Sequence, residues 1–435
     1  MKKINYFCRI IHLISRQKSE NMRKLLTILI ISTILGGGIC QAKPAKKGSK
    51  SEVAKVKVDT TLPSWSEGCL DIHFINSARG ECCFYILPDG TTLLVDAGEV
   101  ADSETSVPQR PNAETKPYIT YAKYIKHFLP QGKEAIDYCS PSHFHTDHIG
   151  SESCVVGTSP AGYRKSGLLA LYDEVPFNHI LDRAYPNYTE DEITPALSGQ
   201  LSQDWAKFVT WGVKKKRFTA ARFLAGEEQI KMLNNPKAHK EFSIFNICAN
   251  GSIWNRTLSG EDRVVESKKL VPGNPSSCGF HIRYGAFDYI ACGDLVSSVQ
   301  NRLAYYFRDF VGDGKLDAFK ANHHLAGNSW GSRMQELNFN PRVVLNHSFT
   351  LNKPDVKKLM HVLPVVESFF TTNLHKDFAN IPEVKANNLV EKITAYNGHI
   401  VLRVAPGGEE FYIYMLDDGD FDYKVKSIHG PYKSR

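Results

Sequence analysis

The chain has 435 residues, and its 42% apolar and 23% charged content is that of a soluble globular protein with one large domain or two ordinary ones. The formal net charge of +7 would suit a nucleic-acid-binding protein, but it is unevenly distributed. Residues 1–42 carry +6 and residues 43–50 carry +4, which leaves −3 for the rest of the chain. This nearly neutral remainder gives no general argument for a polyanionic partner.

The first 42 residues have the organisation of an export signal. A basic stretch, Met22–Lys24, precedes an apolar run, Leu25–Ile39, and a small residue for cleavage follows at Ala42. Residues 1–21 are therefore predicted to be an upstream extension. We expect a periplasmic or secreted protein, with lipidation of Cys40 as an alternative to cleavage after Ala42 and a retained membrane anchor as a further alternative. The apolar run is short for a bilayer span, so none is expected after processing.

Residues 43–65 are rich in lysine, serine and alanine and lack periodicity, which predicts a linker to a domain over residues 66–435. Short β-rich runs follow, with a turn at Pro88–Gly90 between two of them, and then a segment with apolar residues at helical spacing. The predicted elements are strands Leu70–Ile75, Cys82–Leu87 and Thr92–Val95, helix Tyr118–Leu129 and strand Ile136–Cys139.

Four metal-competent side chains follow the last of these strands. They are His143, His145, Asp147 and His148, in the run His-Phe-His-Thr-Asp-His. Imidazole and carboxylate are the ligands that borderline divalent metals prefer. A carboxylate buried among imidazoles without an ion would need another partner. The loop therefore predicts a metal site at the end of a strand.

Residues 185–240 are long, polar and helix-like, so they are predicted to be a helical insertion, with the basic run Lys214–Arg217 on a solvated face. The ten cysteines include no C-x-x-C pair, which indicates neither a zinc ribbon nor a disulfide scaffold. The strand pattern then resumes. Its predicted strands are Phe242–Ala249, Phe280–Tyr284, Phe287–Cys292, Leu316–Lys320 and Val343–Asn346.

Chemistry-bearing residues also follow three other strands. Asp96 begins Asp-Ala-Gly after the third predicted strand, and Asp294 lies in Cys-Gly-Asp-Leu after a later one. The pair His323 and His324 ends the run Phe-Lys-Ala-Asn-His-His after the next strand. A lone aspartate in such a place is usually a turn residue, so it is their combination that indicates a site.

These residues together resemble the metallo-β-lactamase superfamily over most of residues 66–420. The run from His143 to His148 fits its H-x-H-x-D-H signature in full. The metallo-hydrolase domain of bacterial DNA-uptake (competence) proteins, with related secreted phosphodiesterases, is most similar. Two departures lie near the expected mouth of the site: Ala78–Glu81 stands where that subgroup often has Gly-x-Gly-Asp, and Leu325–Gly327 replaces Gly-Ser after the paired histidines.

The resemblance implies an α/β fold, an αββα sandwich with two divalent metal ions at one edge. Zinc is the expected metal, with manganese or iron as alternatives. His324 is favoured over His323 as a ligand, and His179 and Asp182 are the candidates for a further ligand of the first ion. The implied ligands are His143 and His145 for the first ion, Asp147, His148 and His324 for the second, and Asp294 as a bridge.

The resemblance also implies roles for neighbouring residues. Two ions close together lower the pKa of a bridging water, and the hydroxide attacks phosphorus or an acyl carbon. Asp147 would orient that hydroxide. Lys320, Asn322 or His323 would hold a phosphoryl oxygen or protonate the leaving group. Asp96 is the candidate to fix a ligand imidazole.

The sequence thus predicts an exported, dinuclear metal-dependent hydrolase that acts on phosphodiesters. Small-molecule or cell-envelope phosphodiesters are preferred to long nucleic acids, because the domain is nearly neutral. A lactonase or β-lactamase-type C–O or C–N hydrolase is one alternative. A non-catalytic, metal-containing surface or binding protein is another. No oligomeric state is indicated.

Overall fold

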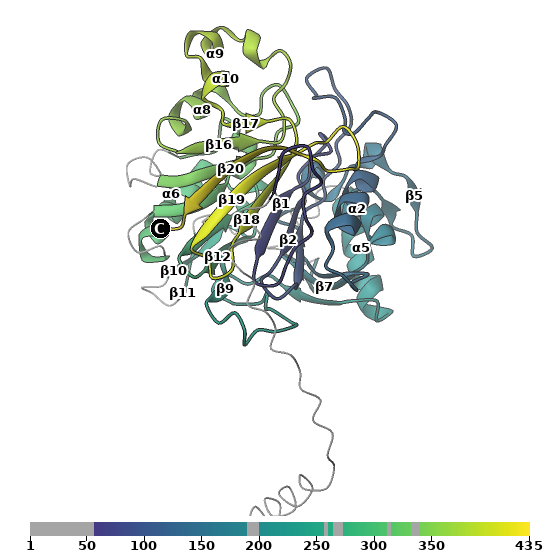
Figure 1. Cartoon of the computed structure of the whole chain (residues 1–435). Coiled ribbons are helices and arrows are strands. Elements are labelled where there is room, and N and C mark those ends of the chain that lie inside the picture. Colours follow the sequence, from purple (N-terminus) through teal and green to yellow (C-terminus); the bar gives the residue numbers. More distant parts are fainter. Residues whose placement is uncertain (1–55, 189–199, 256–259, 264–272, 311–314, 332–339) are drawn as a thin grey trace, which may run out of the picture. The chain divides into compact units, whose positions relative to one another are not determined.

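The computed structural model describes residues 56–188, 200–255, 260–263, 273–310, 315–331 and 340–435 (Figure 1). All of them belong to the compact unit Gly48–Arg435. The predicted export signal, with Cys40, lies outside the described residues. None of the described helices has the length and apolarity needed to cross a bilayer.

The described strands form two large sheets, each of nine strands, and a small hairpin of β5 (Gly157–Thr158) and β6 (Arg164–Lys165). In the first sheet, neighbours from β3 to β8 pair in parallel and the others pair antiparallel. Its order is β20 (Val425–Lys433), β19 (Glu410–Leu416), β18 (His399–Val404), β1 (Leu70–Phe74), β2 (Cys83–Ile86), β3 (Thr92–Val95), β4 (Ile136–Cys139), β7 (Phe177–Asp182) and β8 (Thr219–Arg222).

The second sheet is antiparallel from β11 to β13 and parallel from β13 to β17. Its order is β11 (Gly260–Arg263), β10 (Ser252–Asn255), β9 (Phe242–Ala249), β12 (Gly279–Tyr284), β13 (Phe287–Ala291), β14 (Lys315–Lys320), β15 (Asn340–Asn346), β16 (Ser368–Thr371) and β17 (Ala395–Tyr396).

A shared apolar core lies between the two sheets, where Tyr85 of β2 meets Tyr289 of β13 with their hydroxyls 3.2 Å apart. Two further cores pack helices onto the outer faces. Figure 1 shows α2 and α5 on one side of the strands and α8 to α10 on another. The helices are α2 (Pro117–Phe128), α3 (Thr146–Ile149), α4 (Leu168–Glu174), α5 (Gln200–Lys214), α6 (Ser297–Phe310), α8 (Val356–Val362), α9 (Pro382–Ala386) and α10 (Leu389–Lys392).

These layers confirm the predicted α/β class and αββα order. The predicted bounds of β4 and β9 are those observed, and α2 is displaced by one residue from its predicted position. All eight described cysteines are free, and seven are buried, in agreement with a chain that has no disulfide scaffold.

The predicted helical insertion, residues 185–240, is helical only over α5 in the part that is described. Trp205 and Phe208 of α5 are buried in the core against the first sheet, and β8 then extends that sheet's edge. The segment therefore completes one helical layer and one sheet edge. The basic run Lys214–Arg217 is exposed, as predicted.

Residues 56–65, the described end of the predicted linker, pack on the domain. Thr61 forms a bridge with Lys424 beside β20, and Leu62 is buried in the core on the outer face of the first sheet.

Candidate metal centre

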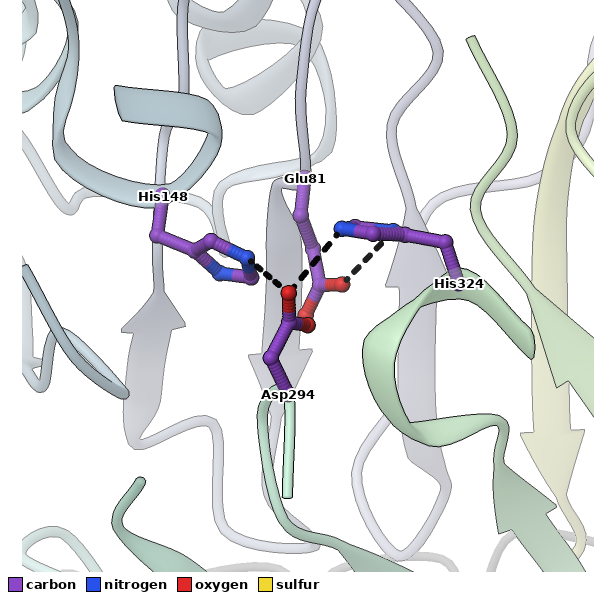
Figure 2. A group of neighbouring side chains, drawn as sticks. All are labelled: Glu81, His148, Asp294 and His324. Atoms are coloured by element: carbon purple, nitrogen blue, oxygen red, sulfur yellow. Dashed lines mark ion pairs between the residues drawn. The ribbon is translucent and has the colours of Figure 1, made fainter. Parts of the chain in front are cut away.

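The predicted site residues meet where strands of both sheets end. His143 to His148 follow β4 of the first sheet, whereas Asp294 follows β13 and His324 follows β14 of the second. The carboxyl ends of parallel strands are the usual place for a site in an open α/β sheet. Figure 2 shows side chains from these segments pointing toward one another, with Glu81 from the turn before β2 among them.

Four buried side chains form the centre of this group. Glu81, His148, Asp294 and His324 each offer one ligand atom, and these atoms lie within 4.8 Å of one another. Asp294 is central, because its Oδ2 lies 3.1 Å from His148 Nε2 and 3.4 Å from His324 Nε2. His324 Nδ1 faces the other way, 3.6 Å from Glu81 Oε2 (Figure 2).

The buried polar atoms of this group fit a divalent cation. Nε2 of His143, His148 and His324 and both carboxylate oxygens of Asp294 are buried and make no hydrogen bond within the described residues. Buried polar atoms normally have partners, because an unpaired one costs about 1–3 kcal/mol. Imidazole nitrogens that converge with a carboxylate are a donor set for zinc, iron or manganese.

The rest of the His/Asp cluster borders this group. The ring of buried His143 lies 4.1 Å from that of His148 and 4.6 Å from that of exposed His145. Asp147 Oδ2 lies 3.3 Å from His324 Nε2. The structure thus brings together the six main predicted ligands, while metal binding by them stays a prediction. These six are His143, His145, Asp147, His148, Asp294 and His324.

The paired histidines have different surroundings. His324 is fully buried, whereas the side chain of His323 is 17% exposed, with its Nε2 3.8 Å from Asp294 Oδ2 and its Nδ1 2.5 Å from Asn328 Oδ1. His324 is thus the more buried of the two, and His323 lies on the more exposed side of the group, while their roles as ligand and substrate contact stay predictions. His323, His324 and Leu325 have φ of 50°, 52° and 56°, a left-handed run that costs non-glycine residues about 1–3 kcal/mol each.

Lys320 was predicted to contact substrate, but its ammonium faces inward. Its side chain is 2% exposed, and its Nζ lies 3.0 Å from Glu81 Oε2, 2.9 Å from the Gly293 carbonyl and 3.3 Å from the Ala321 carbonyl. Its three donors are therefore directed at acceptors within the protein. The geometry favours a positioning role for Lys320 rather than catalysis.

Glu81 is the site residue that the sequence reasoning missed. Its backbone is fixed by two hydrogen bonds, from its own N–H to the Asp147 carbonyl (2.8 Å) and from the Gly98 N–H to its carbonyl (2.9 Å). A Cβ on Gly98 would lie 1.8 Å from the Asp147 carbonyl oxygen, so only glycine allows this approach. The sequence did contain a signal for this role, because Glu81 is an acidic residue at the position of the aspartate in Gly-x-Gly-Asp.

The buried carboxylates of the centre are stabilised by nearby positive charge. Burial raises the pKa of Glu81, and Lys320, His148 and His324 oppose that rise. Burial alone would lower the pKa of His148, but Asp294 and the neighbouring aspartates raise it well above its usual value. A bound divalent cation would supply the charge that these carboxylates need.

Neither candidate for the further ligand reaches the centre. His179 lies in β7 with its Nδ1 2.6 Å from Thr219 Oγ1. Asp182 accepts hydrogen bonds from Tyr188 Oη (2.6 Å), Trp205 Nε1 (2.5 Å) and the Ala184 N–H, so its oxygens are satisfied elsewhere. The geometry therefore supports neither His179 nor Asp182 as a metal ligand of the centre.

Asp96 makes the contact predicted for it. Its Oδ2 lies 2.8 Å from His148 Nδ1, and it accepts two hydrogen bonds of 2.7 Å from the N–H and the hydroxyl of Ser142. This carboxylate fixes the orientation of the His148 ring, so that Nε2 faces Asp294.

Asp96→Asn should lower metal affinity about 10- to 100-fold, because an amide keeps the shape but loses the carboxylate that orients His148. Competition with a chromophoric chelator measures this affinity. Asp137→Asn is the control, since Asp137 bonds Thr92 and Lys133 away from the centre. Equal affinities for all three proteins would contradict the role of Asp96.

Comparison with known proteins gives only distant neighbours. No protein-family model and no curated protein sequence matches the chain. CmlA, a diiron β-hydroxylase from Streptomyces venezuelae, matches at 12% identity and a TM-score of 0.34, and a CmlA variant matches at 12% and 0.36. Each match covers 79% of this chain and 55% of the CmlA chain.

A hydrolase of the beta lactamase superfamily, AbOPH, matches at 10% identity and a TM-score of 0.27, over 59% of this chain and 88% of that one. The chain spans only about half the length of the CmlA proteins. The αββα order described above therefore rests on the strands and helices of this chain itself.

Proposed function

We propose that this protein is a metal-dependent hydrolase whose centre holds two divalent cations and cleaves phosphodiesters. The main support is the convergence of buried imidazole nitrogens on Asp294, which make no hydrogen bond within the described residues. In this assignment His143 and His145 would hold the first cation, and Asp294 would contribute to both sites. Asp147, His148 and His324 hold the second.

Glu81 is assigned to orientation rather than to metal binding. It lies at Nδ1 of His324, whereas Nε2 of that ring faces Asp147 and Asp294. Lys320 neutralises Glu81 from the interior side at 3.0 Å. The pair therefore supports His324 in the way that Asp96 supports His148.

The cations would activate water and polarise the phosphoryl group. Asp147, whose side chain is 14% exposed, is placed to accept a hydrogen bond from the attacking water and align it. His323 lies on the more exposed side of Asp294, where an N–H of the neutral ring would donate a hydrogen bond to a phosphoryl oxygen.

The preferred substrates are small or cell-envelope phosphodiesters. Residues 51–435 carry a formal charge of only −3, which provides no broad basic surface for a long nucleic acid. We further propose that the domain acts in the periplasm or outside the cell, after cleavage of residues 1–42 or lipidation of Cys40. Zinc is the first metal to test, followed by manganese and iron.

Metal analysis combined with two substrates tests this proposal. We expect two divalent ions per chain, cleavage of bis-p-nitrophenyl phosphate, and no cleavage of nitrocefin. The reverse substrate pattern would favour a lactam-type hydrolase. A protein with two ions that hydrolyses neither these substrates nor simple esters and lactones would favour the binding-protein alternative.

Asp147→Ala should abolish turnover and lower metal content, because it removes both a proposed ligand and the group that aligns the water. Atomic absorption and the phosphodiester assay measure the two effects. Glu152→Ala, in the turn that follows α3 and with an exposed side chain, is the matched control and should leave both unchanged. Full activity with unchanged metal content in Asp147→Ala would contradict the mechanism.

A further inference from the structure

A second lysine, Lys353, reaches the centre from the loop after β15. Its Nζ lies 3.4 Å from Asp147 Oδ2 and 4.7 Å from the centroid of the Phe349 ring. Phe349 in turn packs edge-on against His324, with 4.9 Å between ring centroids. The ammonium is therefore held by a carboxylate and an aromatic face next to the proposed second cation.

The backbone that carries Lys353 is fixed by a remote segment. The Val107 N–H donates to the Phe349 carbonyl (2.9 Å) and the Leu351 N–H donates to the Thr105 carbonyl (2.8 Å). Residues 106 and 350 pair as an isolated bridge between these two bonds. This strand-like pairing places the ammonium before any ligand arrives, so little ordering is needed on binding.

Lys353 lies on the accessible side of the centre. Its side chain is 20% exposed, and those of Asp147 and His323 are 14% and 17% exposed. The four residues of the buried group are at most 1% exposed, and so they cannot meet a substrate first. Within the described part of the chain, the Lys353 ammonium contacts the Asp147 carboxylate and the Phe349 ring, whereas the Lys320 ammonium is held by backbone carbonyls.

The charges of the loaded centre favour an anionic substrate. The four positive charges of two divalent cations would be balanced by the four carboxylates of the centre. These carboxylates belong to Glu81, Asp96, Asp147 and Asp294. With neutral imidazoles, the ammonium groups of Lys353 and of Lys320, which pairs with Glu81, would then leave the loaded centre with a net excess of two positive charges. A phosphodiester carries a negative charge that offsets this excess, whereas a neutral ester does not.

We propose that Lys353 binds the anionic phosphoryl oxygen of the substrate, so that the centre selects anionic phosphodiesters over neutral esters. This inference rests on the proposed function. Once cations engage the Asp147 carboxylate, the ammonium exchanges that partner for the substrate oxygen. The Phe349 ring, 4.7 Å from the ammonium, remains its aromatic partner in both states.

The test compares three variants of the metal-loaded, full-length chain. They are Lys353→Met, which keeps an unbranched side chain but removes the ammonium, Lys353→Arg, and Lys357→Met as the exposed control on α8. Calorimetric titration with inorganic phosphate is the binding measurement. Lys353→Met should weaken phosphate binding about 10- to 100-fold, the value of one charge-assisted hydrogen bond, and Lys353→Arg should stay within about 3-fold. Lys357→Met should match the wild type.

Kinetics give a second readout. For Lys353→Met, KM for bis-p-nitrophenyl phosphate should rise more than kcat falls, while the hydrolysis of p-nitrophenyl acetate stays unchanged. Metal content and thermal unfolding should equal those of the wild type, which separates the effect from misfolding.

Unchanged phosphate affinity in Lys353→Met would overturn the inference. A loss of affinity for acetate alone would also overturn it, because it would indicate a carboxylate ligand. The inference is also overturned by a wild type that binds no phosphate. Failure of the proposed function looks different: the wild type would bind phosphate through Lys353 but cleave no phosphodiester.

Discussion

Asp294→Asn is expected to reduce phosphodiester turnover by roughly 10³-fold or more and to lower metal content by at least one ion per chain, because a shared metal ligand contributes several kcal/mol of transition-state stabilisation. Asp294 is the residue on which both imidazoles converge, at 3.1 Å from His148 Nε2 and 3.4 Å from His324 Nε2. An amide has nearly the same shape but lacks the charge, and its nitrogen is not a metal ligand. The two cations would therefore lose the anion that holds them together.

Metal analysis, the phosphodiester assay and thermal unfolding should be run together on this variant. Asp317→Asn is a matched control, since Asp317 is a buried aspartate on β14 whose pKa burial raises to about 7. It lies away from the centre, where its carboxylate accepts from the Asp288 N–H. The control should keep both ions. If Asp294→Asn kept two ions and normal turnover, the ions would have to lie elsewhere in the protein.

The parts of the site that sequence could predict are those that follow clear strands. His143 to His148 come directly after β4, and Asp294 comes shortly after β13, each an apolar run of ordinary strand composition. Parallel strands place their carboxyl ends at one edge of each sheet, and the packing of the two sheets on each other brings the residues beyond β4 and β13 together. The choice of His324 over His323 is matched by their different burial.

Glu81 and Lys353 could not be predicted in the same way. Glu81 stands in a turn, and its place depends on backbone bonds to Asp147 and Gly98, which no local pattern encodes. Lys353 depends on a pairing between residues 105–107 and 349–351, two loop segments with no strand periodicity. Both positions are set by tertiary contacts, which override local propensity.

The strands after β15 were missed for a related reason. β18 is buried along its whole length, and β19 is buried except at its first residue. Burial does not account for this difference, because β4 and β13 are also buried along their whole length and were predicted. What distinguishes β18 and β19 is that they return to the first sheet from the far end of the chain, so that β1 lies between β2 and β18. The local sequence pattern of β18 and β19 does not indicate that they pair in the first sheet.

Loss of one partner from the buried ion pair of Glu81 and Lys320 should strongly destabilise the protein. Either single variant, Glu81→Gln or Lys320→Met, leaves one buried charge without its partner and should lower the free energy of unfolding by about 3–5 kcal/mol. Both side chains are at most 2% exposed, and their 3.0 Å contact is little screened by solvent. The double variant removes both charges and should recover about 2 kcal/mol or more of the summed loss.

Urea unfolding with a chelator present measures these values without a contribution from metal binding. Additive losses in the double variant would contradict coupling between the two groups. Metal affinity then separates folding from positioning. In the double variant His324 Nδ1 no longer faces a carboxylate, so affinity should stay about 10- to 100-fold below wild type even where stability returns. If affinity returned together with stability, the pair would support the fold alone, and the orientation of His324 would be set by its left-handed backbone and its contact with Phe349.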